Sequence, residues 1–294
     1  MPSPQMRAVA VFLRLTANNR MTTAERAQRR LAAPKGSTEP PARVRSRHDV
    51  GSRTVGGFVC HTVAPRGRPA GRAAVYLHCG AYYSELAPQH WALVSRLADA
   101  GVRVEVPHYG LAPQHDHRAA YPFVTEVYRQ LVAEVDAGTV TIAGDSAGGG
   151  LALGLAQTLP DAGLPQPRRL ELLSPWLDLT LSNPDLPAVE RRDPWLASVG
   201  LHEAARAWAG GADPTDPRLS PLNGPLAGLP PMHVSVGTRE ICLPDALLLQ
   251  QRATAAGARL DLTVCDGAVH VYPLTPTPEG RAAARALVER VAVG

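Results

Sequence analysis

Hydrophobic positions along the chain form two kinds of pattern, which alternate through most of its length. Short apolar runs rich in β-branched residues predict buried strands, and longer stretches with apolar residues three or four apart predict helices. The strands are predicted at 43–50, 56–63, 72–77, 102–106, 139–143, 169–173, 232–236 and 260–264. The helices are predicted at 88–100, 119–135, 147–159, 245–256 and 278–291. This alternation favours a largely parallel sheet covered on both faces, with the first two strands antiparallel across a turn near Ser52.

Two segments do not follow this alternation of strands and helices. Residues 4–15 and 22–33 predict two short helices, which a proline-rich linker joins to the remainder of the chain. We expect these helices to pack on the main body as a flap, and an interfacial membrane helix carrying Arg7, Arg14 and Arg20 is the alternative. The interval 175–231 is rich in Pro, Asp and Trp, and its length predicts a cap or lid.

Composition narrows the class of protein. The 294 residues are 45% hydrophobic and 19% charged, which allows a full core and disfavours disorder. No apolar run reaches the roughly 20 residues that span a bilayer. The net charge of +4 is spread along the chain, so nucleic acid is a poor candidate partner. The four cysteines are far apart, without metal-ligand spacing, and no cleavable leader is recognisable, so we expect reduced thiols and a cytoplasmic location.

The strongest chemical signal surrounds Ser146. The strand-like run 139–143 ends directly at Gly144, and a helix-forming stretch begins at Ala147. A serine between glycines at a strand-to-helix turn is typical of a nucleophile, because the tight turn exposes the hydroxyl above the sheet while Gly144 and Gly148 let strand and helix approach closely. The same turn would aim the Ala147 N–H at a reacting carbonyl.

A second segment has the composition of an oxyanion loop. His78 to Tyr83 follow the predicted strand 72–77 directly. The small residues Gly80 and Ala81 would let backbone N–H groups come within hydrogen-bonding reach of a developing oxyanion. His78 is then expected to brace the loop and not to act as the base.

A serine nucleophile needs a histidine base and a carboxylate that orients it, in the chain order serine, acid, histidine. His270 lies in a loop position after the last predicted strand, and we take it as the base. Glu240 lies just past the strand 232–236, at the carboxyl end of the strand, where the acid of such a triad is expected. Asp245 and Asp266 are the alternatives, although the first could cap a helix and the second could hold a turn.

Four segments in this order resemble the hormone-sensitive-lipase-like branch of the α/β hydrolases, a group that includes bacterial carboxylesterases, steryl acetyl hydrolases and monoterpene lactone hydrolases. The resemblance covers most of the chain. It rests on His78-Cys79-Gly80-Ala81-Tyr82 for the HGG[GA] loop, Tyr109-Gly110-Leu111-Ala112-Pro113-Gln114 for the YRLAPE-like motif, Gly144 to Gly149 for GDSAGG, and Val269-His270 near the end.

This resemblance implies an α/β-hydrolase fold, with an eight-stranded, mostly parallel sheet flanked by helices and a helical cap. It implies cap helices and a linker at 1–42, a core at 43–177 and 231–294, and a cap insertion at 178–230. Carried over by position, it assigns the catalytic triad to Ser146, Glu240 and His270, and the oxyanion donors to Gly80, Ala81 and Ala147.

The chain departs from the family pattern at four positions. Cys79 replaces the first glycine of the loop motif, which would cost about 1 kcal/mol of strain if that position required a positive φ. Glu240 stands where aspartate is usual. Gly110 and Gln114 replace the basic and acidic residues of the YRLAPE motif.

The expected function is cleavage of a carboxylic ester or lactone of a small apolar molecule through an acyl-enzyme, without a cofactor or a metal. A non-hydrolytic lyase, dehydratase or cyclase using the same pocket is the alternative, and a non-catalytic ligand-binding protein is a third. His115 and His117, with His108 nearby, lack a third spaced metal ligand.

Aromatic rings near the expected pocket are candidate substrate-binding residues, although core packing would account for them equally well. Partners are expected to be limited to the small substrate, without nucleic acid or stable membrane insertion, and a homodimer is left open. The rings are those of Tyr82, Tyr83, Trp176 and Tyr272.

Overall fold

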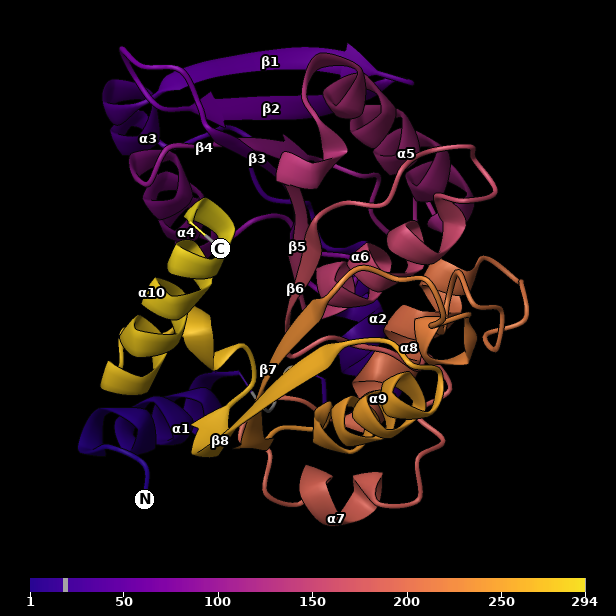
Figure 1. Cartoon of the computed structure of the whole chain (residues 1–294). Helices are drawn as coiled ribbons and strands as arrows, with labels where there is room; N and C mark the ends of the chain where they lie inside the picture. The colour runs from indigo at the N-terminus through magenta and orange to yellow at the C-terminus, as the bar shows by residue number, and fades with distance from the viewer. Residues whose placement is uncertain (18–20, 294) are drawn as a thin grey trace.

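The computed structural model describes residues 1–17 and 21–293, and its centre is one twisted sheet of eight strands (Figure 1). The strand order is β1-β2-β4-β3-β5-β6-β7-β8, in which β2 is antiparallel to both of its neighbours and the other pairs are parallel. The sheet is therefore mostly parallel, as predicted. Its strands are β1 (Asp49–Val55), β2 (Phe58–Ala64), β3 (Arg72–Leu77), β4 (Val102–Pro107), β5 (Val140–Asp145), β6 (Arg169–Leu173), β7 (Met232–Arg239) and β8 (Leu260–Val269).

Helices cover both faces of the sheet (Figure 1). One face packs against α3, α4 and α10, and the other packs against α5, α6 and α9. Parallel strands covered in this way are buried on both sides, which explains why their sequences read as short, nearly continuous apolar runs. These helices are α3 (Ala42–Arg47), α4 (Pro88–Asp99), α5 (His117–Glu134), α6 (Ala147–Thr158), α9 (Leu243–Ala255) and α10 (Pro278–Ala292), and short 3₁₀ turns η2 (Ala137–Thr139), η3 (Pro221–Asn223) and η4 (Tyr272–Leu274) join other elements.

The predicted first strand is wrong in its position. Residues 43–50 were expected to be extended, but they form α3 and only the beginning of β1. Val44 is the only buried residue of this short helix, so an apolar residue in a run of arginines was mistaken for a strand signal. The hairpin turn accordingly lies at Gly56 and Gly57, where φ is positive, and not near Ser52. The antiparallel pairing of the first two strands is confirmed.

The N-terminal segment forms the two predicted helices, α1 (Pro4–Thr16) and α2 (Ala24–Ala32). Met6 and Ala10 of α1 pack in a small cluster with Ala268, Val269 and Tyr272, while α2 packs against α8. The apolar residues Val11, Phe12 and Leu15 of α1 are exposed. Arg20, part of the interfacial alternative, lies outside the described residues. Among the helices of the described residues, none is both long and apolar enough to span a bilayer.

The interval between β6 and β7 carries two helices, α7 (Leu186–Glu190) and α8 (Ser198–Ala209). Trp208 of α8 is fully buried and stacks on Tyr82 at a centroid distance of 4.2 Å. This contact packs the interval onto the loop after β3. The division of the chain into a core, N-terminal cap helices and a cap insertion stays a prediction.

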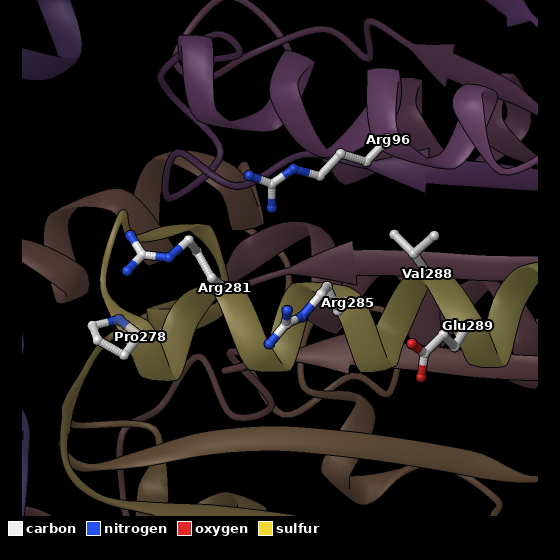
Figure 2. A pocket seen from close by; sticks show the side chains of 6 residues that line it. All are labelled: Arg96, Pro278, Arg281, Arg285, Val288 and Glu289. Atoms are coloured by element: carbon white, nitrogen blue, oxygen red, sulfur yellow. The ribbon is translucent and has the colours of Figure 1, made fainter.

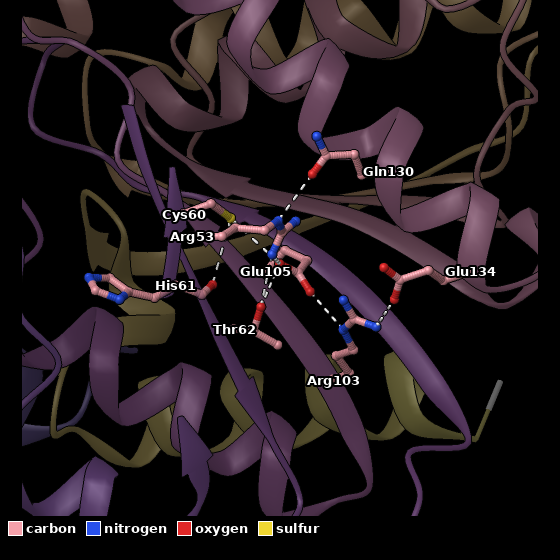
Figure 3. Close-up of polar contacts among 8 residues, drawn as sticks. All are labelled: Arg53, Cys60, His61, Thr62, Arg103, Glu105, Gln130 and Glu134. Carbon is pink, nitrogen blue, oxygen red and sulfur yellow. Dashed lines mark hydrogen bonds and ion pairs between the residues drawn. The ribbon is translucent and has the colours of Figure 1, made fainter. Parts of the chain in front are cut away.

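A buried carboxylate joins strands at the β1 edge of the sheet (Figure 3). Glu105 of β4 has no exposed surface, and it accepts hydrogen bonds from Arg53 Nη1 at 2.5 Å, Thr62 Oγ1 at 2.9 Å and Arg103 Nε at 2.7 Å. Two guanidinium groups therefore balance one buried negative charge, and this arrangement satisfies the carboxylate without water.

Glu105→Ala should lower the free energy of unfolding by about 2–4 kcal/mol, because it removes the buried acceptor that Arg53 and Arg103 share and leaves a void in its place. Urea unfolding of the whole chain measures this change. Glu134→Ala is the matched control, since its carboxylate pairs with Arg103 but is 58% exposed. That variant should lose less than about 1 kcal/mol. Equal losses in the two variants would contradict the structural role of Glu105.

Candidate active site

Ser146 lies at a sharp turn between β5 and α6. Its φ of 51° and ψ of −119° are strained for a residue with a side chain, and such values recur at functional turns. A Cβ on Gly144 would come within 2.2 Å of the Gly148 carbonyl oxygen, and one on Gly148 within 2.1 Å of the Leu77 carbonyl oxygen. Both glycines are thus required by close backbone approach, as the sequence predicted.

Three side chains from separate parts of the chain meet at this turn. His270 Nε2 lies 2.9 Å from Ser146 Oγ, and His270 Nδ1 lies 2.7 Å from Glu240 Oε2. All three residues are buried. Glu240, directly after β7, thus makes the contact expected of the acid.

The two alternative acids do not contact His270. Asp245 lies in the first turn of α9, although Cys242 is the N-cap, and it accepts a hydrogen bond from Asn183 at 2.9 Å. Burial raises the pKa of Asp245 to about 6. Asp266 is 75% exposed and lies near the chain's N-terminal amine. Of the three acids considered, only Glu240 is hydrogen-bonded to the imidazole.

The environment favours a basic imidazole at His270. Burial alone would lower the pKa of His270, but the hydrogen bond and the negative charge of Glu240 outweigh burial and raise it. A histidine with a raised pKa is a stronger proton acceptor, which is the property that a general base for a serine hydroxyl requires.

Ser174 is a member of this site that the sequence analysis missed. Its hydroxyl donates to Glu240 Oε1 at 2.8 Å and accepts from the backbone N–H of Val271 at 2.9 Å. Ser174 therefore links the acid to the loop that carries His270. It follows β6 directly, and this position at the carboxyl end of a strand is the signal that could have identified it.

Asp193 is a second residue that was missed, and it connects the 178–230 interval to the acid. Its Oδ1 accepts from the N–H groups of Trp195 at 2.7 Å and Leu196 at 3.0 Å, and its Oδ2 accepts from the N–H of Ile241 at 2.9 Å. Burial raises the pKa of Asp193 to about 6 despite these three donors. One carboxylate thus holds two segments of backbone beside Glu240.

The loop after β3, residues 78–85, is called the His78 loop below. Three consecutive residues of this loop have a positive φ, namely Gly80 at 118°, Ala81 at 47° and Tyr82 at 62°. A Cβ on Gly80 would come within 2.2 Å of the Ser84 carbonyl oxygen, so only glycine fits there. Gly80 and Ala81 border the same cavity as Ser146, and Ala147 is the first residue of α6, directly after Ser146.

Cys79 does not carry the strain that its replacement of a glycine suggested. Its φ is not among the positive values of the chain. The thiol lies 3.3 Å from His90 Nε2 and close to the buried carboxylate of Asp145. Burial and the Asp145 charge raise the pKa of the Cys79 thiol, so the thiol is neutral and a poor nucleophile.

A cavity of about 540 Å³ opens above Ser146 and His270. Its walls come mainly from α1, α2, the His78 loop, the segment 195–197 and the turn after β8. The lining is predominantly apolar, and the Trp195 ring lies edge-on to His270 at a centroid distance of 5.6 Å. Apolar contributors include Val9, Phe12, Leu13, Met21, Trp195, Leu196, Leu201 and Leu274.

Only one of the four aromatic residues expected to bind substrate borders this cavity. Tyr83 does, whereas the rings of Tyr82, Trp176 and Tyr272 are about 98% buried and pack in the interior. Tyr82 lies between Trp208 and Trp176, and Tyr272 packs against α1. This placement corrects the expectation for those three residues, because one ring within the His78 loop and the rings that follow β6 and β8 fill the interior beneath the cavity floor.

A second cavity, of about 560 Å³, lies between α4 and α10. Figure 2 shows its lining, in which Arg96, Arg281 and Arg285 are spread along the groove. None of the described residues that line this groove is a serine, histidine or cysteine, so the chemistry is assigned to the first cavity.

Three groups of side chains in the described residues each place three potential metal-ligand atoms within 4.8 Å of one another. Glu240, Cys242 and His270 form one, but both His270 nitrogens already face Glu240 and Ser146. Cys79, His90 and Asp145 form another. Because His90 Nδ1 accepts the Ala87 N–H at 2.7 Å, the ring proton lies on Nε2, which then cannot bind a metal. The third group consists of His78, Glu85 and His108.

Comparison with known proteins agrees with this geometry. A family model described as the alpha/beta hydrolase fold matches residues 74–274. An acetyl-hydrolase of Streptomyces hygroscopicus is 37% identical over 236 residues, covering 78% of each chain. An esterase of Acinetobacter venetianus is 33% identical over 196 residues, covering 65% of this chain and 64% of its own.

Solved structures are similar over nearly the whole chain. An esterase from the bacterial hormone-sensitive lipase family superposes with a TM-score of 0.84 at 30% identity, covering 99% of this chain and 98% of its own. The esterase EstE5, soaked with p-nitrophenyl butyrate, has a TM-score of 0.84 at 28% identity, covering 99% of this chain and 100% of its own.

Proposed function

The chain belongs to the hormone-sensitive-lipase-like branch of the alpha/beta hydrolases and is a carboxylic ester hydrolase, and on that premise we propose that it cleaves short-acyl esters of small apolar alcohols through an acyl-enzyme on Ser146. One observation carries this proposal. A strained serine, a histidine and a buried glutamate form a continuous hydrogen-bonded line at the floor of an apolar cavity.

In the first half-reaction, His270 Nε2 takes the proton of Ser146 as Oγ attacks the ester carbonyl carbon. The carbonyl oxygen becomes negatively charged, and the N–H groups of Gly80, Ala81 and Ala147 are proposed to stabilise it. His270 then gives its proton to the departing alkoxide, which leaves as the alcohol. Ser146 retains the acyl group.

In the second half-reaction, water replaces the alcohol. His270 takes a proton from the water as its oxygen attacks the acyl carbon, and returns that proton to Ser146 Oγ when the carboxylic acid leaves. Glu240 keeps the Nδ1 proton in place and stabilises the imidazolium in both halves. No step that forms or breaks a bond in this cycle requires a cofactor.

The structure gives less support to the alternative functions that the sequence left open. A non-catalytic binding protein would be expected to lack one member of the triad, whereas Ser146, Glu240 and His270 are all in contact. For a lyase, dehydratase or cyclase, no separate feature of the cavity gives support, and the relatives are named for hydrolysis. Lactone cleavage uses the same steps and stays within the proposal.

The cytoplasmic location and the homodimer also stay proposals. The location is supported by the cysteines, since Cys60, Cys79, Cys242 and Cys265 are all free thiols.

A series of p-nitrophenyl esters tests the substrate class. The cavity of about 540 Å³ is of the size that encloses one small ligand. We therefore expect kcat/KM to be highest for the acetyl and butyryl esters, and at least about tenfold lower for the palmitoyl ester, whose chain cannot be buried. Steady-state rates measured under identical detergent conditions check this. A maximum at the palmitoyl ester would contradict a short-acyl preference.

A further inference from the structure

We propose that a divalent transition-metal ion, Zn²⁺ above others, binds beneath the His78 loop through His78 Nε2, a Glu85 carboxylate oxygen and His108 Nδ1. One ligand atom from each of these three residues lies within 4.8 Å of the other two. Glu85 Oε2 and His108 Nδ1 are 3.5 Å apart, a separation close to that of two ligands on one tetrahedral zinc ion. This site departs from the sequence expectation of no metal.

The tautomer of His78 is set by the backbone. His78 Nδ1 lies 2.7 Å from the Cys79 carbonyl oxygen, which can only accept a hydrogen bond. Nδ1 therefore carries the ring proton and Nε2 presents a lone pair. A histidine held in this way by a backbone carbonyl is the usual arrangement for a metal ligand. Its fully buried ring also stacks on Tyr109 at 4.5 Å, which fixes its orientation.

The ligand atoms at this place are buried and lack hydrogen-bond partners. His78 Nε2, both ring nitrogens of His108 and Glu85 Oε2 have none within the described residues. His78 is 0% and His108 5% exposed. Leaving one buried polar atom unpaired typically costs about 1–3 kcal/mol, so several unpaired atoms in one place indicate a shared ligand.

The chemistry of these atoms favours a cation over a water molecule. With the His108 ring proton on Nε2, a carboxylate oxygen and two imidazole nitrogens offer three lone pairs to one point, whereas a water molecule can donate only two hydrogen bonds. Two neutral imidazoles and a carboxylate are a common ligand set for zinc. Glu85 also borders the active-site cavity, which gives an ion an access route.

The position of the site indicates what the ion would do. His78 and Glu85 stand at the two ends of the His78 loop, and His108 directly follows β4. An ion held by all three would tie the loop that carries Gly80 and Ala81 to the sheet. Its role would be structural, and the proposed acyl transfer does not involve it.

Titration of the chelator-stripped full-length protein with Zn²⁺ in a calorimeter tests the proposal. We expect one equivalent to bind the wild-type protein and to raise its Tm. In Glu85→Gln and in His108→Gln, affinity should fall at least about tenfold, because one ligand atom is lost. His202→Gln is the matched control, since this exposed histidine on α8 lies outside the group, and its affinity should equal that of wild type.

Cobalt substitution separates this site from the two cysteine-containing groups. Co²⁺ bound by two imidazoles and a carboxylate should give visible d–d bands without a thiolate-to-cobalt charge-transfer band. The spectrum is recorded on the wild-type protein, so this test of the site does not depend on whether a variant folds. A thiolate band, the absence of stoichiometric binding, or unchanged affinity in Glu85→Gln would each overturn the proposal, and the last two would leave the proposed ester hydrolysis untouched.

Discussion

Ser146→Ala should lower kcat for p-nitrophenyl butyrate by about 10⁶-fold, because removing the nucleophile of a serine triad disables the histidine and the acid as well. The residual rate should come from binding and oxyanion stabilisation by the remaining groups. Rates of the purified variant, measured at substrate saturation, check this expectation. Its thermal unfolding should match that of the wild-type protein closely, since only one hydroxyl is removed.

The control for this variant is Ser46→Ala, which removes a hydroxyl from an exposed serine in α3. Its kcat should equal that of the wild-type protein. Undiminished ester cleavage in Ser146→Ala, in a preparation free of other esterases, would eliminate Ser146 as the nucleophile.

Glu240→Gln should lower kcat/KM by about 10⁴-fold. The glutamine amide can donate to His270 Nδ1, which places the ring proton on Nε2 and removes the lone pair that must accept the serine proton. The same change should alter the pH profile. His270 must be neutral to act as a base, so activity is lost as the pH falls through its pKa.

The direction of the pH shift follows from the charge of Glu240. In the wild-type enzyme this charge raises the pKa of His270 above its ordinary value of 6.5, so the acid limb of kcat/KM should lie above pH 6.5. In Glu240→Gln the limb should move to lower pH, because the stabilisation of the imidazolium is lost. Profiles of kcat/KM against pH measure both quantities.

Glu240→Asp is the conservative control, because it restores the carboxylate that is usual in the family but retracts it by one methylene. It should recover part of the activity and keep the acid limb raised. If Asp245→Asn abolished activity while Glu240→Gln retained it, Asp245 would be the acid instead.

Much of the fold could be predicted from the sequence, because buried parallel strands and the helices between them leave distinct patterns. β5 (Val140–Asp145) was predicted at 139–143 and α6 (Ala147–Thr158) at 147–159, so the observed bounds lie within two residues of the predicted ones. The region 43–50 could not be predicted correctly, because one buried valine among arginines is compatible with either a helix or a strand.

In the site, the sequence identified the residues whose position is fixed by the end of a neighbouring strand. Ser146, Glu240 and His270 each follow a strand at its carboxyl end, and the structure brings the three into contact, while their catalytic roles stay proposals. The cavity walls depend on how α1, α2 and the 178–230 interval pack, which no local pattern encodes. For this reason Tyr82, Trp176 and Tyr272 were expected at the cavity, whereas Phe12, Leu13 and Leu196 line it.

The proposed function requires that Ser146 becomes acylated during turnover. The most direct measurement mixes enzyme with p-nitrophenyl acetate, quenches with acid during the pre-steady state and maps the peptides by mass spectrometry. The peptide containing Ser146 should gain the mass of one acetyl group, and Ser146→Ala should show no acylated peptide. Turnover without any acylated peptide, or an acetyl group on a different side chain whose loss abolishes activity, would contradict it.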